Sequence, residues 1–531
     1  MLPQYTPYAV SREESNSPTR LNIEKMEILK DKIERWNGRI GRMKSIWSIT
    51  ANHFKAEKPK EKKAEVIVIG AGMAGVLTAY FLKQAGISVM ILEANGVGSG
   101  QTKNTTAKVT AQHGDIYHKL IENFGWEKAR QYADANRIAL DQYKRLIKDL
   151  CIECNFEIMP SYLYSLKEEE ILEKEAICSR NLGLDTFYTT KTTLPFTVKS
   201  AVKMERQAQF HPLRFLYTLA DNLPVYEHTK VIKIKDKKIW TDQGEFYGDK
   251  IIFTSHYPFL NFPGLYFTKI HQERSYLSAW KTDYPLDGMY YGIDEDGLSF
   301  RKFQNMLLIG GASHRTGENT SGGNYDRLKQ AGKTYFPTSS LQMLWSAQDC
   351  ITLDEIPYIG KYSRLYSNWY VATGFKKWGM SFSMIAARLL SDQIMGVPNP
   401  YASIFSPQRF SLKAEKEKIK EGCYSIKNLW KEFMTVPKNV FESLAPGQGG
   451  VVRYQGKKVG AFKDKNGEVY LVSTKCPHLG CQMAWNPEEL TWDCPCHGSR
   501  FDYKGNLLNN PSKKSISWRG EKELINGGKD R

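Results

Sequence analysis

Two short loops near the C-terminus carry the residues best suited to redox chemistry. Residues 476–481 read Cys-Pro-His-Leu-Gly-Cys, and residues 494–499 read Cys-Pro-Cys-His-Gly-Ser. Each loop offers one thiolate and one imidazole: Cys476 and His478 in the first, Cys494 and His497 in the second. Such a set can hold a 2Fe–2S cluster asymmetrically, with both cysteines on one iron and both histidines on the other. A structural zinc site uses the same ligand types but usually pairs like with like, so the mixed loops favour the iron–sulfur cluster over zinc.

A second motif indicates a dinucleotide-binding fold. Residues 66–69 (Val-Ile-Val-Ile) predict a strand, Gly-Ala-Gly-Met-Ala-Gly follows at 70–75, and a helical pattern precedes a second strand that ends at Glu93. Gly70 permits the tight turn, Gly72 lets the backbone approach a pyrophosphate, and Gly75 allows close helix–strand packing. Glu93 is placed to accept hydrogen bonds from an adenosine ribose.

The motif alone does not distinguish FAD from NAD, but two further segments favour FAD. Residues 96–107 form a glycine-rich and then polar run that includes Ser99 and suits a long cofactor. Residues 368–375 predict another strand with a turn at Gly374, followed by a helix from about 380 to 395. The N-terminus of that helix could face the N1–O2 edge of a flavin, where negative charge builds on reduction.

Residues 445–511 resemble Rieske domains over their whole length, including Trp-Asn-Pro at 485–487. The resemblance implies that Cys476 and Cys494 bind one iron and that His478 and His497 bind the other. It also implies a disulfide between Cys481 and Cys496, and a hydrogen bond from Ser499 to a bridging sulfide. Phe501 stands where high-potential members have a tyrosine, so we expect a lower potential than in the respiratory-chain members.

Residues 45–400 resemble the D-amino-acid-oxidase-like (glycine oxidase/sarcosine oxidase) flavoprotein superfamily. The segments that carry the resemblance are 70–93, 97–100, 250–255, 308–311, 354–360 and 372–375. Members bind FAD and oxidise C–N bonds of amines and amino acids, and Val231 falls where the family's backbone contacts the adenine. The fusion of such a domain to a C-terminal Rieske domain resembles a group of bacterial FAD-dependent oxidoreductases.

The expected fold is an α/β Rossmann-type FAD-binding domain with an interleaved mixed-sheet substrate domain, plus a C-terminal all-β Rieske domain. The expected boundaries are 64–403 for the flavin domain, with 151–330 largely substrate subdomain and built of short strands and turns. A linker helix occupies 404–435 and the Rieske domain 436–531. Residues 1–63 form a basic amphipathic helix and a charged linker.

The amphipathic helix has three open interpretations: packing on the protein's own surface, contact with a partner, or contact with a membrane surface. Its apolar stripe consists of Met26, Leu29, Ile33, Trp36, Ile40, Met43 and Trp47.

Composition narrows the functional classes. The 531 residues carry a formal charge of +17, but the basic residues are spread along the chain and form no nucleic-acid-binding module. No apolar run is long enough for a transmembrane helix, and no secretory signal is visible, so we expect a cytoplasmic protein.

The two cofactors together predict a dehydrogenase. A substrate, expected to be an amine or amino acid, would give a hydride to FAD, and electrons would leave singly through His478 and His497 to an external carrier. Hydride transfer from a neutral amine needs no protein base, so the catalytic residues are unknown. The alternatives are an electron-transfer protein without a small amine substrate, and a cluster with only a structural role.

Several other residues admit a functional interpretation beside a structural one. His113 and His118 have a spacing known from mononuclear iron sites, but the accompanying aspartate is missing. Arg274 and residues 314–317 could meet an anionic substrate or form ordinary ion pairs. Cys151 and Cys154 could be a redox pair, although an accidental pair in a turn is favoured.

Overall fold

The computed structural model describes residues 44–434, without 53, 55, 57 and 58, and residues 443–517. The stripe from Met26 to Met43 lies outside the described residues. Trp47 is described and is fully buried in the short helix α2 (Ile46–Thr50), where its indole N–H donates to the Thr105 carbonyl at 2.7 Å. This end of the predicted stripe therefore packs on the protein itself.

The first sheet has a parallel centre, as a dinucleotide fold requires. Its strand order is β16-β17-β10-β1-β2-β7, with the hairpin β8–β9 attached to β10. The central strands are buried on both faces, which explains their uninterrupted apolar sequences. The strands are β1 (Lys63–Ile69), β2 (Val89–Leu92), β7 (Val225–Tyr226), β8 (Val231–Lys235), β9 (Lys238–Thr241), β10 (Gly244–Phe253), β16 (Tyr358–Lys361) and β17 (Trp369–Thr373).

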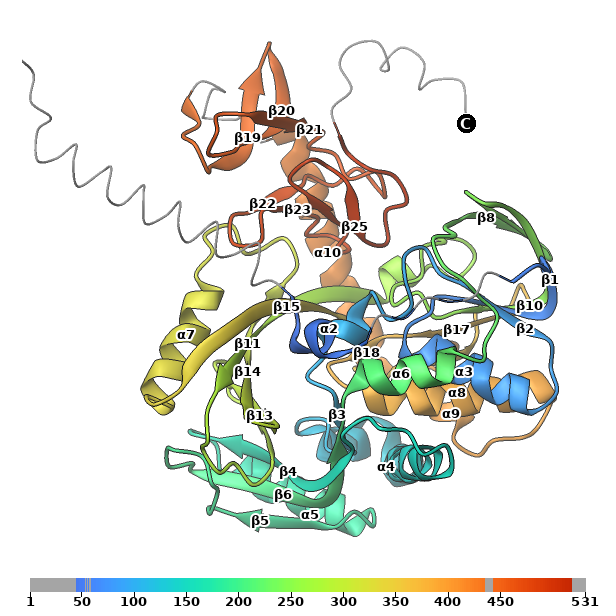
Figure 1. Cartoon of the computed structure of the whole chain (residues 1–531), viewed down its shortest axis with the longest axis vertical. Helices are drawn as coiled ribbons and strands as arrows, with labels where there is room; N and C mark the ends of the chain where they lie inside the picture. The colour runs from blue at the N-terminus through green and yellow to red at the C-terminus, as the bar shows by residue number, and fades with distance from the viewer. Residues whose placement is uncertain (1–43, 53, 55, 57–58, 435–442, 518–531) are drawn as a thin grey trace, which may run out of the picture. The chain divides into compact units, whose positions relative to one another are not determined.

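Two helices pack on this sheet next to the glycine turn at residues 70–75. Helix α3 (Met73–Gln84) follows β1 through the glycine turn, and α8 (Gly379–Met395) lies beside it, as Figure 1 shows. Both helices are largely buried. The predicted strand–turn–helix–strand unit at 66–93 is therefore present, and so is the predicted helix after Gly374.

The second sheet is mixed and has ten strands in the order β18-β15-β11-β14-β13-β12-β4-β6-β3, with β5 beside β6. Most neighbours are antiparallel, whereas β12 runs parallel to β4. The strands are β3 (Lys108–Val109), β4 (Glu157–Ser165), β5 (Thr186–Thr189), β6 (Ser200–Gln209), β11 (Ile270–Lys281), β12 (Met289–Gly292), β13 (Ser299–Phe303), β14 (Met306–Arg315), β15 (Ser340–Thr352) and β18 (Phe375–Lys376).

Residues 151–330 differ from the predicted run of short strands and turns. They contain the helices α5 (Glu170–Asn181), α6 (Pro212–Ala220) and the start of α7 (Asn324–Tyr335). Their strands β7 to β10 join the first sheet rather than the second. The two sheets are thus interleaved in sequence, because the chain leaves the first sheet after β2, builds β3 to β6 of the second sheet, and returns to the first sheet at β7. Helix α4 (Ile116–Asp149) precedes this stretch and is kinked at Gly125, whose φ is 80°.

The C-terminal domain is built of two small antiparallel sheets. The first contains β19 (Gly449–Tyr454), β20 (Lys457–Lys463) and β21 (Val469–Val472). The second contains β22 (Ala484–Asn486), β23 (Thr491–Asp493), β24 (Arg500–Asp502) and β25 (Leu507–Asn509). Helix α9 (Ala402–Phe405) and the long helix α10 (Leu412–Met434) come before this domain. Among the described residues, no helix is long and apolar enough to cross a membrane.

Candidate functional site

A large cavity opens where β1 turns into α3, and we call it the main cavity. All but one of the predicted FAD-contacting residues line it, namely Gly70, Gly72, Glu93, Ser99, Val231 and Gly374. The exception is Gly75, which lies beneath the turn. A Cβ on Gly75 would come within 1.9 Å of the Gly70 carbonyl oxygen, so only glycine lets helix and strand approach this closely.

The chemistry of this wall suits a phosphate- and ribose-bearing ligand. Gly72 caps α3, and the first residues of α8 also line the cavity, so two helix N-termini meet it. The Glu93 carboxylate accepts one hydrogen bond from the Ala71 amide and one from the Asn95 amide, both at 2.8 Å. Each carboxylate oxygen retains a further lone pair for a hydroxyl group. Burial raises the pKa of Glu93, against the lowering effect of these two amides.

His256 also lines the main cavity, although no sequence motif marked it. Its backbone has a φ of 66°, a conformation rare for a residue with a side chain. The ring atom Nε2 is buried and has no hydrogen-bond partner among the described residues. Burial lowers the pKa of His256 to about 4, so the ring is neutral at pH 7. The cavity thus contains an unsatisfied polar atom that a bound cofactor would satisfy.

A smaller cavity, the side cavity, adjoins the main cavity and shares Thr105, Ala347, Asp349 and Lys377 with it. The Lys377 ammonium donates to Ser275 Oγ at 3.1 Å, and Ser275 donates to Asp349 Oδ2 at 2.8 Å. Further along the wall, Lys108 donates to the Tyr290 carbonyl at 2.8 Å and to Ser299 Oγ. The side cavity therefore presents charges of both signs at the edge of the main cavity.

Burial shifts the pKa of each of these charged groups. It lowers the pKa of Lys108 to about 7, and nearby Arg301 adds to the effect. Burial also lowers the pKa of Lys377. The electrostatic attraction of Tyr291, Asp349 and Glu273 outweighs this effect, so the pKa of Lys377 is raised. Burial raises the pKa of Asp349, although Lys377 opposes the rise. Near pH 7, Lys377 is thus charged, whereas Lys108 is close to its titration point.

The four predicted cluster ligands form two pairs in the C-terminal domain, one of thiols and one of imidazoles. The thiols of Cys476 and Cys494 lie within hydrogen-bonding distance, and this contact lowers the pKa of Cys476. The rings of His478 and His497 face each other with centroids 4.8 Å apart. In both rings Nδ1 is buried without a partner among the described residues. Two adjacent thiols and two unsatisfied imidazole nitrogens fit a 2Fe–2S cluster held by mixed ligands.

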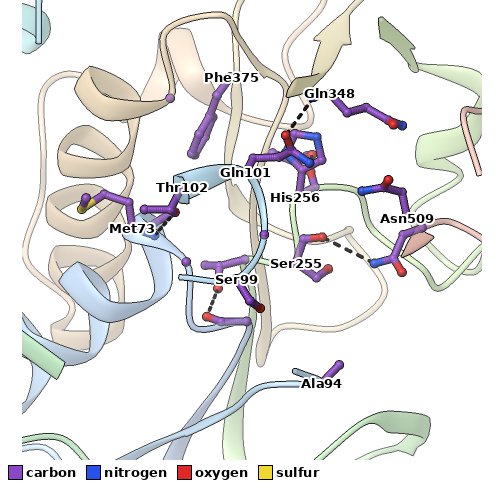
Figure 2. Close-up of a pocket in the computed structure, with 18 of the residues that line it drawn as sticks. Met73, Ala94, Ser99, Gln101, Thr102, Ser255, His256, Gln348, Phe375 and Asn509 are labelled. Atoms are coloured by element: carbon purple, nitrogen blue, oxygen red, sulfur yellow. Dashed lines mark hydrogen bonds between the residues drawn. The ribbon is translucent and has the colours of Figure 1, made fainter. Parts of the chain in front are cut away.

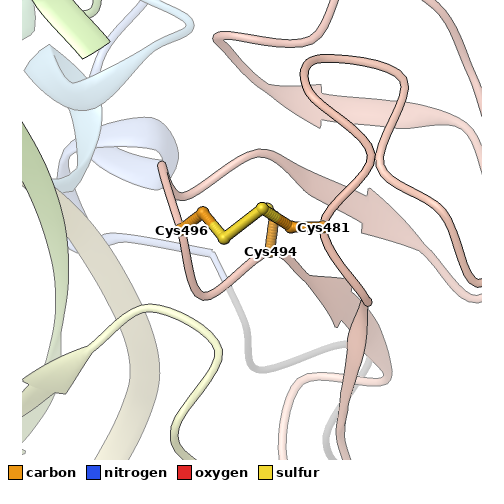
Figure 3. Close-up of side chains that lie close together, drawn as sticks. All are labelled: Cys481, Cys494 and Cys496. Carbon is orange, nitrogen blue, oxygen red and sulfur yellow. A yellow bond between two sulfur atoms is a disulfide. The ribbon is translucent and has the colours of Figure 1, made fainter. Parts of the chain in front are cut away.

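A disulfide links the two loops covalently. Cys481 is bonded to Cys496, as the family resemblance implies, and the sulfur of Cys494 lies within 4.8 Å of both (Figure 3). The disulfide occupies the sulfurs of Cys481 and Cys496, so Cys494 is the member of this trio that can bind iron. Ser499 Oγ hydrogen-bonds to Cys476 and accepts from the Ser512 amide at 2.9 Å, and Phe501 is fully buried.

The second loop (494–499) is buried along its whole length against the sheets of the flavin-type domain. Gln272 Nε2 donates to the His497 carbonyl at 2.7 Å, and Gln348 Nε2 donates to the Gly498 carbonyl at 2.7 Å. The Arg315 guanidinium, paired with Glu421 at 2.6 Å, also reaches the Pro495 and Cys496 carbonyls at 3.3 Å. These contacts fix the backbone on both sides of His497.

Gln348 connects this loop to the main cavity, which it lines. Its amide also donates to Gln272 Oε1 at 2.6 Å, and its backbone N–H donates to Gln101 Oε1 at 2.8 Å. The remaining atom, Gln348 Oε1, is buried with no partner among the described residues. In Figure 2, Gln348 and His256 lie on the side of the cavity toward Asn509, which itself belongs to the C-terminal domain.

The first loop (476–481) has different surroundings. Pro477 and Leu479 are exposed and His478 is half-buried. One hydrogen bond ties its histidine to the flavin-type domain: His478 Nε2 lies 2.7 Å from Asn261 Oδ1. The edge of the Phe267 ring contacts both histidines, at centroid distances of 6.0 Å and 5.8 Å.

The other residues with two interpretations have structural partners. His113 bonds to Tyr132 and to the Thr110 carbonyl, and His118 pairs with Glu175 at 2.8 Å. Arg274 is buried in an ion pair with Glu489 at 2.5 Å. Cys154 is buried and Cys151 is exposed, and neither forms a disulfide. These arrangements favour the structural interpretation in each case.

Comparison with known proteins agrees with both sites. A family model described as FAD dependent oxidoreductase matches residues 65–393, and one described as Rieske 2Fe–2S domain matches residues 436–519. The chain belongs to the FAD-dependent oxidoreductase family. It combines this FAD-binding domain with a C-terminal Rieske domain that binds a 2Fe–2S cluster.

One relative matches most of the chain, and another matches a short part of it. The chain is 38% identical over 476 residues to the Rieske 2Fe–2S iron–sulfur protein YhfW of Bacillus subtilis (strain 168), covering 86% of this chain and 93% of that protein. Over 48 residues it is 42% identical to the cytochrome b6-f complex iron-sulfur subunit 1 of a Nostoc species, covering 9% of this chain and 27% of that protein.

Two solved structures share the fold of the FAD-binding part. Glycine oxidase from Geobacillus kaustophilus aligns with a TM-score of 0.57 at 18% identity and covers 66% of this chain and 100% of that one. L-proline dehydrogenase from P. horikoshii aligns with a TM-score of 0.56 at 15% identity and covers 66% of this chain and 98% of that one.

Proposed function

We propose that this chain dehydrogenates a small amine or amino-acid-like substrate and delivers the electrons one at a time, through its cluster, to an external acceptor. FAD takes up an electron pair as a hydride, whereas a Rieske cluster accepts and releases single electrons. The observation that carries the proposal is the position of Gln348. Its side chain lines the main cavity and also bonds to the loop of His497.

The residues of the two cofactor sites have distinct proposed roles. Gly70, Gly72, Gly75 and the N-terminus of α3 hold the FAD pyrophosphate, and Glu93 holds the ribose. Ser99, Val231 and Gly374 complete the cavity wall. Cys476 and Cys494 bind one iron, and His478 and His497 bind the other through Nδ1, the atom that both rings leave unsatisfied.

The side cavity is the proposed substrate site. Lys377 and Lys108 supply positive charge for a carboxylate, and Asp349 supplies a negative partner for an amine. Ser275 bridges Lys377 and Asp349, which holds the two opposite charges at a fixed separation beside the main cavity. Lys108 is buried and Lys377 and Asp349 are half-buried, so partial exclusion of water strengthens their interaction with a bound zwitterion. The names of the similar structures, glycine oxidase and L-proline dehydrogenase, agree with this substrate class.

Anaerobic mixing with a panel of amines and amino acids tests the proposal. We expect the flavin absorbance to fall with one class of substrate, followed by the electron paramagnetic resonance (EPR) signal of a reduced Rieske cluster. In a Cys476→Ser variant the flavin absorbance should still fall, while delivery to an external one-electron acceptor stops. If no small molecule reduces the flavin but a reduced carrier protein does, the chain is an electron-transfer protein instead. If delivery continues in Cys476→Ser, the cluster is structural.

A further inference from the structure

The first loop lies in a surface groove between the two domains. The groove is lined by Asn261 and Phe262 from the flavin domain and by Pro477, His478, Lys513 and Lys514 from the Rieske domain. Phe262 is 75% exposed and Leu479 is 43% exposed. The half-buried imidazole of His478 therefore has exposed apolar side chains as well as polar ones around it.

The charge around this groove is positive. Lys513 and Lys514 are exposed, and Lys230 reaches over to donate to the Lys513 carbonyl at 3.0 Å. None of the described residues that line the groove is acidic. The whole chain carries a formal charge of +17, so the local and the overall fields have the same sign.

We propose that this groove is the docking surface for an acidic one-electron carrier protein, which receives electrons at His478. The proposal rests on the function proposed above and adds the place and the partner class. An apolar centre with a charged rim suits a transient complex, because the rim steers the encounter while a small apolar contact lets the partner leave quickly. One electron passes from the reduced chain to the oxidised carrier, and no bond is made or broken.

The test bypasses the substrate. The complete holoprotein is reduced with dithionite, freed of excess reductant and mixed with an oxidised acidic blue-copper protein or with a basic c-type cytochrome. The wild type should reduce the acidic probe faster at low ionic strength, and the advantage should shrink as salt rises from about 10 mM to about 500 mM. A Lys513→Glu/Lys514→Glu variant should lose roughly tenfold or more of its rate with the acidic probe and gain with the basic one.

A matched variant separates local from overall charge. Lys144→Glu/Lys148→Glu makes the same change in net charge on α4, a helix that contacts α5, α8 and α9. It should change both rates less than twofold. The EPR spectrum of the cluster serves as the folding control, because it should be the same in all three proteins.

Three outcomes would overturn the inference. The first is a loss in the Lys144/Lys148 variant equal to that in the Lys513/Lys514 variant. The second is a rate with the acidic probe that does not depend on salt. The third is transfer to neither protein probe while a quinone in added lipid vesicles is reduced, which would make the groove a membrane-side site. Failure of every amine to reduce the cluster, with transfer to the acidic probe intact, would instead contradict only the proposed substrate reaction.

Discussion

The two loops that supply the cluster ligands have similar sequences but opposite surroundings. Each begins with Cys-Pro, contributes one histidine and one disulfide cysteine, and closes around the same centre. The second loop is buried and is held by side chains from β11, β14 and β15. The first loop is partly exposed and bonds to the other domain through Asn261. Under the function proposed above, we therefore expect electrons to enter the cluster beside His497 and to leave it beside His478.

The largest effect is expected when the second loop loses its amide donors. A Gln272→Met/Gln348→Met variant removes the donors to the buried His497 and Gly498 carbonyls and a third bond to the Asn510 carbonyl. Leaving the two buried carbonyls unsatisfied costs the docked arrangement about 2–6 kcal/mol in total. Substrate-driven reduction of the cluster, followed by stopped-flow absorbance, should slow by at least about tenfold. Delivery from the dithionite-reduced protein to an external acceptor should be unchanged.

Gln342→Met provides the control, because Gln342 lies on the same strand β15 but is exposed. Its cluster should be reduced at the wild-type rate. Reduction of the cluster at the wild-type rate in the double variant would show that electron transfer from flavin to cluster does not depend on these two glutamines.

The buried ion pair beside the second loop should give the next largest effect. Burial alone would raise the pKa of Glu489, but Arg274 and Arg500 outweigh it and lower the pKa to about 2. The carboxylate therefore stabilises the folded protein above its ordinary pKa, near 4.5, and this contribution disappears as the pH falls toward 2. Arg274→Met should cost about 3 kcal/mol at pH 7 and should move the onset of acid unfolding to higher pH.

Calorimetry between pH 3 and pH 7 measures both consequences. Arg327→Met, which breaks the exposed pair with Asp296, should leave the melting curve nearly unchanged. An Arg274→Met protein with wild-type acid stability would mean that the ion pair does not hold the domains together.

A substitution in the side cavity should affect substrate binding and neither loop. Lys108→Met removes a charged hydrogen-bond donor, worth about 1.5–3 kcal/mol, so KM for a carboxylate-bearing substrate should rise about 10–100-fold. Because burial lowers the pKa of Lys108 to about 7, the wild-type KM should rise above that pH as the lysine loses its proton. In Lys108→Met this pH dependence should vanish, while cluster reduction at saturating substrate stays the same. A pH-independent wild-type KM would remove Lys108 from the site.

The smallest effect is expected at the first loop. Asn261→Leu removes the acceptor for the His478 Nε2 proton, 2.7 Å away, and makes the imidazole a weaker electron donor to iron. The midpoint potential of the cluster should rise by about tens of millivolts in an EPR-monitored titration. The rate of reduction by substrate should change little. A drop as large as that in the Gln272/Gln348 variant would erase the distinction between the loops.

The sequence predicted the parts of the sites that are local in the chain. The glycine turn occupies residues 70–75, and the four cluster ligands lie in two short loops between residues 476 and 499, so spacing alone indicates their chemistry. Gln272, Gln348 and Asn261 carry no such signal. They lie beside the cluster loops only because β11, β15 and the loop before η2 (Tyr266–Thr268) pack against the Rieske domain.

The same packing between the domains determines the partner of Arg274. Arg274 was a possible substrate ligand from the sequence, yet its partner Glu489 lies 215 positions away and makes it part of the domain interface. His256 was missed for a related reason. A single histidine after a strand carries no functional signal in the sequence. Only the structure shows its left-handed backbone and its unpaired Nε2 at the cavity.

The central claim is that electrons enter the cluster beside the second loop and leave it beside the first. It is tested most directly by measuring reduction of the cluster and transfer to the acceptor in two variants. In the Gln272→Met/Gln348→Met protein, substrate should reduce the cluster slowly while transfer to an acidic carrier stays at the wild-type rate. In the Lys513→Glu/Lys514→Glu protein the pattern should be reversed. If both variants slow the same step, or if each slows both steps equally, the division between the loops is contradicted.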